Sequence, residues 1–245
     1  MIDELVQESQ KVGLRINKKK TVAMCNVPIT SPNSLDIKIN GQTIELVEKF
    51  IYLGSCISFG ANNTNEIQRR ISSAWGAFTK HRQFLTDRRA APRLKKRVFL
   101  TCVVPCILYG CEAWSLRTED RRKIDVAQRR MERAMLGVTR LDRIRNEEIA
   151  MRTRLPRVTE LSWKRKVNWG WKVANAEERK WSRKISEWCP LENRRMRGRP
   201  LQRWEDDFKE RLQEAGIPGV LWMRVARGPK KEWLDLMTPA RSRRS

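Results

Sequence analysis

Histidine is almost missing from this sequence of 245 residues, in which His81 is the single example. A Ser–His–Asp triad would have to be assembled around that imidazole, and no surrounding motif indicates one. The sequence also lacks the G-x-x-x-x-G-K-[ST] loop that holds nucleotide phosphates. These absences exclude the familiar signatures of triad hydrolases and of P-loop nucleotide-binding enzymes.

Cysteines are few and scattered, without C-x-x-C spacing. They are Cys25, Cys56, Cys102, Cys106, Cys111 and Cys189. Structural zinc sites usually use closely spaced Cys and His pairs, so this spacing disfavours zinc. We expect buried thiols in a reducing compartment instead.

A paired-carboxylate signature is also missing. Among adjacent acids, only Asp206-Asp207 suggests two-metal chemistry. Successive side chains on a helix point about 100° apart, so these two are poorly placed to share one metal ion. We expect them to carry helix-start charge or to pair with Arg203, and the sequence predicts no metal site.

Long apolar runs are absent as well. The best candidate, residues 98–109, is shorter than the about 20 residues that a membrane span needs, and Pro105 interrupts it. Met1 is followed by Asp3 and Glu4, not by the basic start of a signal peptide. We therefore expect a soluble intracellular protein of the nucleus, the cytoplasm or both, without a membrane partner.

What the sequence does contain is positive charge. Its 52 Lys and Arg exceed its 28 Asp and Glu, giving a net charge of +24, and residues 1–65 hold only 7 of the basic and 6 of the acidic side chains. Such an excess repels itself unless it meets a polyanion. Because 40% of residues are hydrophobic and ten are Trp, one or two cores can form. The composition predicts a folded nucleic-acid-binding protein.

A β-hairpin is predicted around Asn40-Gly41, because this pair readily adopts the positive φ angles of a type I′ turn. A two-residue turn there sets Ile37 opposite Ile44 and Leu35 opposite Leu46. One face of the hairpin is then apolar and the other polar.

From Thr64 onward the apolar period changes from two to about 3.6, which predicts helices. Gly13 and Gly137 are expected to end helices in the left-handed conformation, and Pro105 to kink one or end its first part. Further helices are expected to begin near Pro92, at Thr118 and at Asn146, and a longer one carries Trp163, Val167, Gly170, Trp171 and Ala174 on one face.

The tryptophans have two predicted roles. Trp75, Trp163 and Trp171 share amphipathic stripes and are expected to be buried. Trp169 and Trp181 are freer, and an exposed indole among basic residues can stack an unpaired base, worth about 1–3 kcal/mol.

An arginine-rich stretch covers residues 188–204, with no acid between Glu192 and Glu205. Its core, residues 197–200, is similar to the AT-hook, which lies in the minor groove of AT-rich DNA. The alternative is a solvated basic loop in which Pro200 starts the helix that bears Trp204. Both interpretations remain open at this point.

Several motifs follow one another along nearly the whole chain. Residues 13–21 fit a G-L-x-I-N-x-x-K-T segment, and residues 50–55 contain Y-L-G. Residues 66–74 and 108–114 supply E-I, R-I and L-Y-G motifs, and residues 188–207 contain W-x-P, R-G-R-P and R-W-x-D-D. In order and spacing, they resemble the C-terminal part of the reverse transcriptase of non-LTR retrotransposons, of the endonuclease-bearing RTE-like type.

The resemblance implies a mainly α protein, α+β in class, with a helical thumb and C-terminal domain and a small N-terminal antiparallel β-hairpin from the palm. Residues 1–60 would be the end of the palm with its primer-grip strand, and residues 61–160 a helical thumb-like region. Residues 161–240 would form a basic, Trp-rich C-terminal domain. We expect residues 241–245 to be a disordered tail.

Site residues follow from the resemblance and from the charge. Lys20 matches a lysine that assists pyrophosphate departure as a proton donor in such polymerases, and Tyr52, Leu53 and Gly54 match the primer grip. The predicted nucleic-acid-binding residues are Arg121, Arg122, Arg129, Arg130, Arg133, Arg194, Arg195, Arg197, Gly198, Arg199 and Arg203.

Two departures from the family bear on function. Residues 169–173 are W-G-W-K-V where the family has W-x-G-H-V, so Lys172 replaces a histidine. The family's catalytic Asp-Asp motif and earlier metal-binding aspartate do not occur in these residues, and we expect them upstream of Met1. The predicted function is therefore a truncated reverse transcriptase that holds nucleic acid without polymerising. It needs no cofactor, and magnesium is implied only for the full-length enzyme.

The expected partners are an RNA or DNA template–primer or genomic DNA, and the sequence does not identify which proteins bind this chain. An alternative is an exapted basic DNA- or RNA-binding protein that uses the segment from Arg197 to Pro200 independently of any polymerase.

Overall fold

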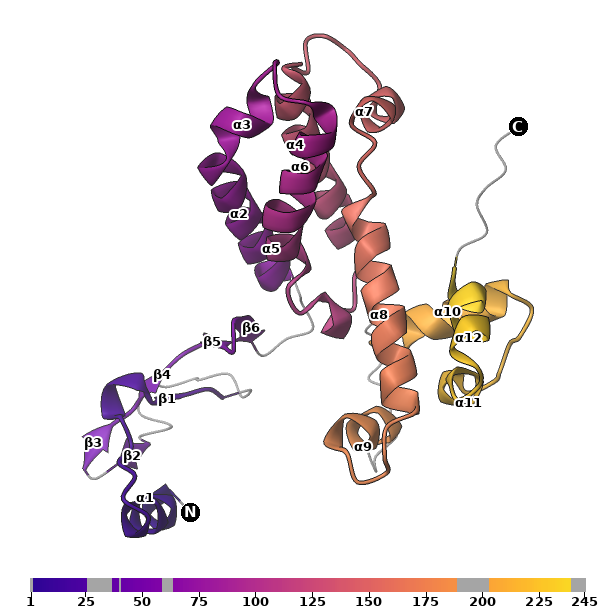
Figure 1. Cartoon of the computed structure of the whole chain (residues 1–245). Coiled ribbons are helices and arrows are strands. Elements are labelled where there is room, and N and C mark those ends of the chain that lie inside the picture. Colours follow the sequence, from indigo (N-terminus) through magenta and orange to yellow (C-terminus); the bar gives the residue numbers. More distant parts are fainter. Residues whose placement is uncertain (1, 26–36, 40, 59–63, 189–202, 239–245) are drawn as a thin grey trace. The chain divides into compact units, whose positions relative to one another are not determined.

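The residues that the structure describes are mainly helical, with short strands between residues 22 and 58, as predicted for an α+β chain (Figure 1). It forms two compact units, residues 1–62 and 63–245. The computed structural model describes residues 2–25, 37–39, 41–58, 64–188 and 203–238. The division into palm, thumb and C-terminal regions, and the predicted disorder of residues 241–245, remain predictions.

Where the structure describes it, the first unit contains one α-helix, one 3₁₀ turn and three small sheets. These elements are α1 (Ile2–Lys11), a 3₁₀ turn (Lys18–Lys20), β1 (Val22–Ala23), β2 (Lys38–Ile39), β3 (Gln42–Thr43), β4 (Glu45–Leu46), β5 (Lys49–Tyr52) and β6 (Ser55–Ser58). In the described part, β1 pairs with β4 in parallel, and β2 with β3 and β5 with β6 antiparallel.

The hairpin predicted around Gly41 is confirmed where the structure describes it. Gly41 has a φ of 76°, Ile39 pairs with Gln42, and the backbone N–H of Ile44 donates to the carbonyl of Ile37 at 2.8 Å. Ile37 and Ile44 on the predicted apolar face are partly buried, whereas the described residues of the polar face are exposed. Asn40 and Leu35 lie outside the described residues.

Helix α1 ends at Lys11, and Gly13 just beyond it has the left-handed conformation predicted to stop the helix. Gly13 has a φ of 76°, its N–H donates to the carbonyl of Gln10, and the N–H of Leu14 donates to that of Ser9. These two bonds satisfy carbonyls that the end of a helix otherwise leaves free.

The second unit is helical throughout its described part. Its helices are α2 (Thr64–Lys80), α3 (Arg82–Thr86), α4 (Pro92–Val98), α5 (Val104–Leu108), α6 (Thr118–Leu136), α7 (Asn146–Thr153), α8 (Val158–Ala174), α9 (Trp181–Glu187), α10 (Asp206–Glu214), α11 (Trp222–Ala226) and α12 (Lys230–Met237). The predicted starts at Thr64, Pro92, Thr118 and Asn146 are all confirmed, as is the end of α6 at Gly137, with a φ of 67°.

Pro105 disturbs its helix without ending it. A π-helical turn, Phe99–Val103, joins α4 to α5, and the N–H of Val104 donates to the carbonyl of Phe99, five residues earlier. Proline lacks an N–H and its ring crowds the preceding turn, so widening this turn lets the helix continue. The predicted disturbance is confirmed as a π-turn.

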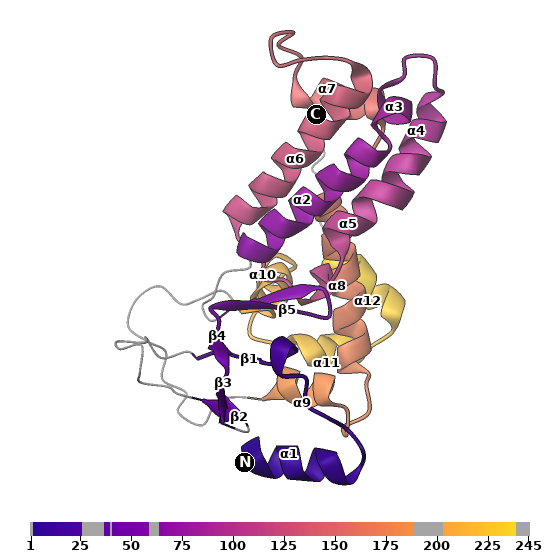
Figure 2. The same ribbon diagram turned by 90° about the vertical axis from the view of Figure 1, so that its left-hand side faces the viewer.

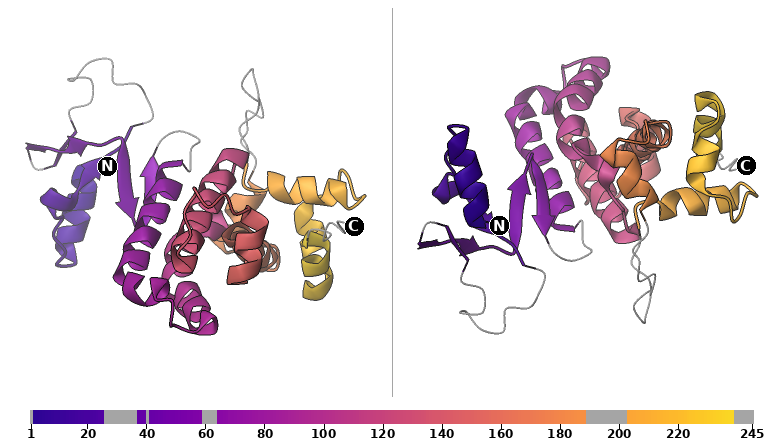
Figure 3. Two further views of the ribbon diagram at one scale, coloured as in Figure 1. Left: turned by 90° about the horizontal axis from the view of Figure 1, so that it is seen from above. Right: turned by 90° about the horizontal axis from the view of Figure 1, so that it is seen from below.

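Two hydrophobic cores stabilise this unit. The first lies between α2, α4, α5 and α6, and Figure 2 shows α2 and α6 running alongside each other. The second lies between the C-terminal half of α8 and α10, α11 and α12, which cluster together in Figure 3. Helix α8 contributes Val158 to the first core and Val167 to the second. One helix thereby belongs to both cores.

Gly170 on α8 allows the close approach of a ring from α10. A Cβ atom at Gly170 would lie 2.8 Å from Cζ of the buried Phe208, whereas nothing lies within 4 Å of a Cβ at Gly76 in α2. Overpacking a core costs about 1–3 kcal/mol, and Gly→Ala in an open helix gains about 1 kcal/mol. We expect Gly170→Ala to lower the free energy of unfolding, net, by about 1 kcal/mol and Gly76→Ala to raise it, measured by urea denaturation. Equal stabilisation by both changes would contradict this packing.

Candidate nucleic-acid interface

The five predicted arginines of α6 divide into two groups. Arg122 and Arg130 are exposed, and neither forms an ion pair with any residue that the structure describes. Arg121, Arg129 and Arg133 instead bond to other parts of the protein. Only the first group has its charge fully available to a ligand.

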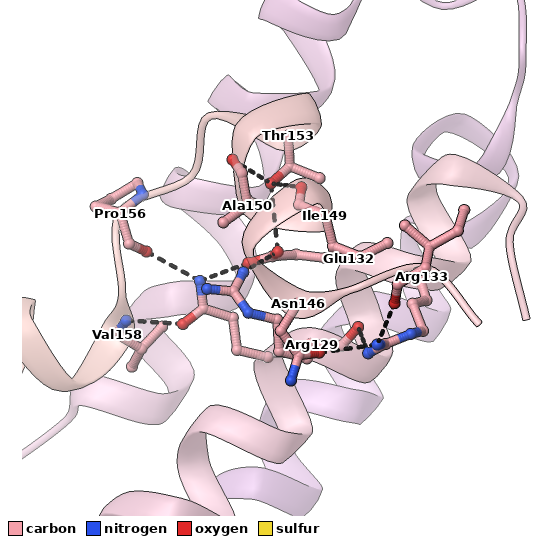
Figure 4. A network of polar contacts seen from close by, with 11 residues as sticks. Arg129, Glu132, Arg133, Asn146, Ile149, Ala150, Thr153, Pro156 and Val158 are labelled. Carbon is pink, nitrogen blue, oxygen red and sulfur yellow. Dashed lines mark hydrogen bonds and ion pairs between the residues drawn. The ribbon is translucent and has the colours of Figure 1, made fainter. Parts of the chain in front are cut away.

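Arg129 belongs to a buried polar network that joins α6 to α7 and α8 (Figure 4). Its guanidinium pairs with Glu132, whose side chain is fully buried. Glu132 also accepts hydrogen bonds from Nε2 of Gln128 at 2.7 Å and from Oγ1 of Thr153 at 3.3 Å. Oε1 of Gln128 accepts a hydrogen bond from the backbone N–H of Val158 at 2.8 Å. The network holds the start of α8 against α6, so Arg129 has a structural function.

Arg133 spans the loop before α7 in the same region (Figure 4). Its Nη2 donates to Oδ1 of Asn146 at 2.8 Å and to the carbonyl of Ile144 at 3.4 Å. Contact of Arg129 and Arg133 with nucleic acid stays a prediction, but both already have partners within the protein.

Asp207 forms a buried ion pair that the sequence did not indicate. Its Oδ2 lies 2.5 Å from Nζ of Lys166, and its Oδ1 lies 3.2 Å from Nη2 of Arg121. Lys166 also donates to the carbonyl of Trp114 at 3.0 Å. Burial lowers the pKa of Lys166 below its ordinary value, and the neighbouring Asp207 carboxylate opposes that shift. The pair joins α10 to α8 and, through Arg121, to α6.

The two adjacent acids therefore differ in role. Oδ2 of Asp206 accepts the backbone N–H of Arg203 at 2.6 Å, which confirms the predicted helix-start function. Asp207 lies in the first turn as well, and its carboxylate pairs with Lys166, which was not among the expected partners. The sequence did indicate that Lys166 needs a partner, although not which one. Lys166 lies on the apolar stripe between Trp163 and Gly170, where a charge requires a partner.

A cavity of about 10 Å³ lies beside this pair, lined by Lys166, Asp207 and Cys111 among others. Such a volume suits a single water molecule, not a substrate. Burial raises the pKa of Cys111 to about 12, so its thiol is unreactive. Cys111 is buried, as expected. The other described cysteines are partly exposed, contrary to expectation, and Cys189 lies outside the described residues.

The Y-L-G motif forms the end of a strand and a turn, not a strand throughout. Tyr52 ends β5 and pairs with Ser55, while Leu53 and Gly54 have φ angles of 47° and 76°. Positive φ at both positions is the geometry of a tight hairpin turn. The large side chains of this hairpin are exposed, including Leu53 at 76%. The motif therefore lies at an accessible hairpin tip, and its primer-grip role stays a prediction.

Lys20 is exposed and ends the 3₁₀ turn of residues 18–20, next to β1. Oγ1 of Thr21 donates to the carbonyl of Asn17 at 2.9 Å, which holds the turn closed.

The arginine-rich segment lies mostly outside the described residues. This applies to Arg194, Arg195, Arg197, Gly198, Arg199 and Pro200. Trp204 lies in a turn before α10, and its Nε1 donates to the carbonyl of Glu112 at 2.6 Å. A helix from Pro200 that bears Trp204 is therefore wrong. Arg203 is exposed.

Among the described residues, no group of three His, Cys, Asp or Glu side chains is arranged to hold a metal ion. None of the described helices combines the length and the hydropathy needed to cross a membrane.

Comparison with known proteins gives one informative result. No protein family model matches the chain, and no solved structure does. A transposon-derived protein of Caenorhabditis elegans is 29% identical over 246 residues, which cover 97% of this chain and 87% of that protein. This likeness over nearly the full length of both chains supports a transposon origin for the protein.

Proposed function

We propose that this chain is the palm end, thumb and C-terminal region of a non-LTR retrotransposon reverse transcriptase, and that it binds template and primer. The transposon origin and the order of the sequence motifs support this proposal. The 245 residues contain no Asp-Asp polymerase motif, so polymerisation and its magnesium ions are not proposed for them alone. In this proposal, the tip of the β5–β6 hairpin contacts the primer, and Lys20 would act as a proton donor only in the full-length enzyme.

The observation that carries nucleic-acid binding is the exposed, uncompensated charge of α6. Arg122 and Arg130 have no acidic partner among the described residues. Buried carboxylates that already have partners inside the protein cannot neutralise them. These carboxylates are Glu66, Asp120, Glu132 and Asp207. The four buried carboxylates are thus paired in the interior, whereas Arg122 and Arg130 face solvent. This distribution of charge favours a polyanionic ligand.

Binding should depend steeply on salt, because each phosphate contact contributes a slope of about 0.9 in log affinity against log salt. We expect the double change Arg122→Ala with Arg130→Ala to lower that slope by about 2, weakening binding to all sequences alike. Filter binding of an RNA–DNA hybrid from low to moderate salt measures both quantities.

Arg152→Ala is the matched control, because Arg152 lies on α7 and pairs with Glu148 at 2.5 Å. The control should leave the slope nearly unchanged. An affinity that does not vary with salt, or an equal effect of the control, would refute the proposed interface.

A further inference from the structure

Helix α9 presents its apolar side chains to solvent. Trp181 and Ile185 of α9 and Trp188, the residue directly after the helix, lie at positions i, i+4 and i+7, and their exposed fractions are 74%, 67% and 70%. Apolar residues at this spacing share one face, which in most helices packs on a core. No residue of α9 is buried. We name these three residues the outward stripe.

Charged residues attach α9 to the rest of the unit. Arg183 donates from Nη1 to the carbonyl of Ala176 at 2.9 Å and from Nε to Glu187 at 3.0 Å. Glu187 also accepts Nη2 of Arg227, at the end of α11, at 2.9 Å. The side chain of Arg183 is only 14% exposed. The helix therefore directs its ionic contacts toward the rest of the unit and its apolar residues toward solvent. The hydrogen bonds of Arg183 and Glu187 fix this orientation.

Cations lie among the exposed indoles. Nζ of Lys184 lies over the Trp181 ring, 5.3 Å from its centroid. Arg179 and Lys180 are exposed just before the helix, and beyond Trp188 the sequence continues into a segment with four arginines before Pro200. Lysine is depleted at protein–protein interfaces, so the exposed Lys180 and Lys184 beside the rings favour a polyanionic ligand over a protein. Cations beside flat aromatic rings are the combination that binds unpaired bases and their phosphates.

We propose that the outward stripe is a stacking platform for single-stranded nucleic acid. The rings of Trp181 and Trp188 would stack on unpaired bases, Ile185 would fill the space between them, and Lys180 and Lys184 would contact phosphates. This proposal rests on the proposed nucleic-acid binding and adds the form of the ligand, a strand with unpaired bases. Duplex bases are already stacked on one another and are not available to the platform.

Two double variants of the full chain test the platform. Trp181→Leu with Trp188→Leu keeps apolar surface but removes the aromatic rings, and Trp181→Phe with Trp188→Phe keeps rings. We expect the leucine pair to weaken binding of a single-stranded oligonucleotide by about 30-fold or more, the loss of two stacked bases. Its affinity for a duplex of equal length should not change. The phenylalanine pair should retain most of the single-strand affinity. Fluorescence anisotropy at one fixed salt concentration measures all of these affinities.

Each outcome decides between distinct conclusions. Unchanged single-strand affinity in the leucine pair, or equal loss on single strand and duplex, overturns the platform while nucleic-acid binding stands. The parent chain could also associate with itself. If the leucine pair abolishes this self-association and the phenylalanine pair does not, the outward stripe is an interface between copies, and the platform is overturned. Failure of the parent chain to bind any nucleic acid overturns the proposed function itself. Thermal melts should show that both variants fold, since the substituted side chains are exposed.

Discussion

Replacing Asp207 with alanine should lower the free energy of unfolding by about 3–5 kcal/mol, because the change leaves Lys166 buried without its carboxylate. Lys166 and Asp207 are each about 5% exposed, and their charged atoms lie 2.5 Å apart. Asp206 is the matched control, since its carboxylate accepts a backbone N–H at the start of α10 and acts on Lys166 only through its more distant charge. Asp206→Ala should cost about 1 kcal/mol. Urea denaturation of both variants measures the difference.

Removing both charges tests whether the cost comes from the unpaired cation. Replacing a buried ion pair with well-packed apolar side chains is often neutral or stabilising. Lys166→Met combined with Asp207→Leu should therefore be more stable than Asp207→Ala alone. Equal stability of the single and double variants would show that the pair is solvated and not buried.

The pH dependence of the Asp207→Ala variant gives an independent readout. Burial lowers the pKa of Lys166 from its ordinary 10.5, and the variant loses the carboxylate that opposes this shift. Between the lowered folded-state pKa and 10.5, the unfolded chain binds more protons than the folded chain, so the free energy of unfolding rises with pH. We expect the variant to regain stability relative to the parent chain as the pH approaches 10. A constant difference across that range would contradict a charged, buried Lys166.

Local backbone demands were the part of the fold that could be predicted from sequence. Gly13, Gly41 and Gly137 each adopt the positive φ that was expected, because few other residues do so without strain. Pro105 disturbs its helix as its missing N–H requires. Helix starts likewise follow from apolar periodicity. These features depend on neighbours in sequence, so no tertiary contact was needed to find them.

Long-range pairing could not be predicted. Asp207 meets Lys166 across 41 residues of sequence, and the adjacent Asp206 has the same side chain but a different role. Helix α9 shows the same limit for periodicity. The spacing of Trp181 and Ile185 defines a face but does not say whether that face meets a core, and here it does not. Arg129 likewise faces a buried Glu132 although its sequence context resembles that of the exposed Arg130.

Trp233→Ala should also cost about 3–5 kcal/mol, because it removes a large side chain from a closed core. The ring of Trp233 is 1% exposed, lies 5.4 Å from that of Phe208 between centroids, and donates from Nε1 to the carbonyl of Val167 at 2.9 Å. The cavity left behind is surrounded by α8, α10 and α11, which cannot all move inward to fill it. Denaturation followed by circular dichroism measures the loss.

Trp181→Ala is the matched control for Trp233→Ala, since both changes replace an indole with a methyl group. Trp181 is 74% exposed and lies on α9, so its loss should alter the free energy of unfolding by no more than about 0.5 kcal/mol. For single-strand binding, the order of the two variants should be the opposite of their order in stability. At a temperature where both variants are folded, Trp181→Ala should weaken single-strand binding and Trp233→Ala should not. Similar stability losses in the two variants would show that the second core is not packed around Trp233. Similar binding losses would show that single-strand affinity depends on the fold as a whole and not on the outward stripe.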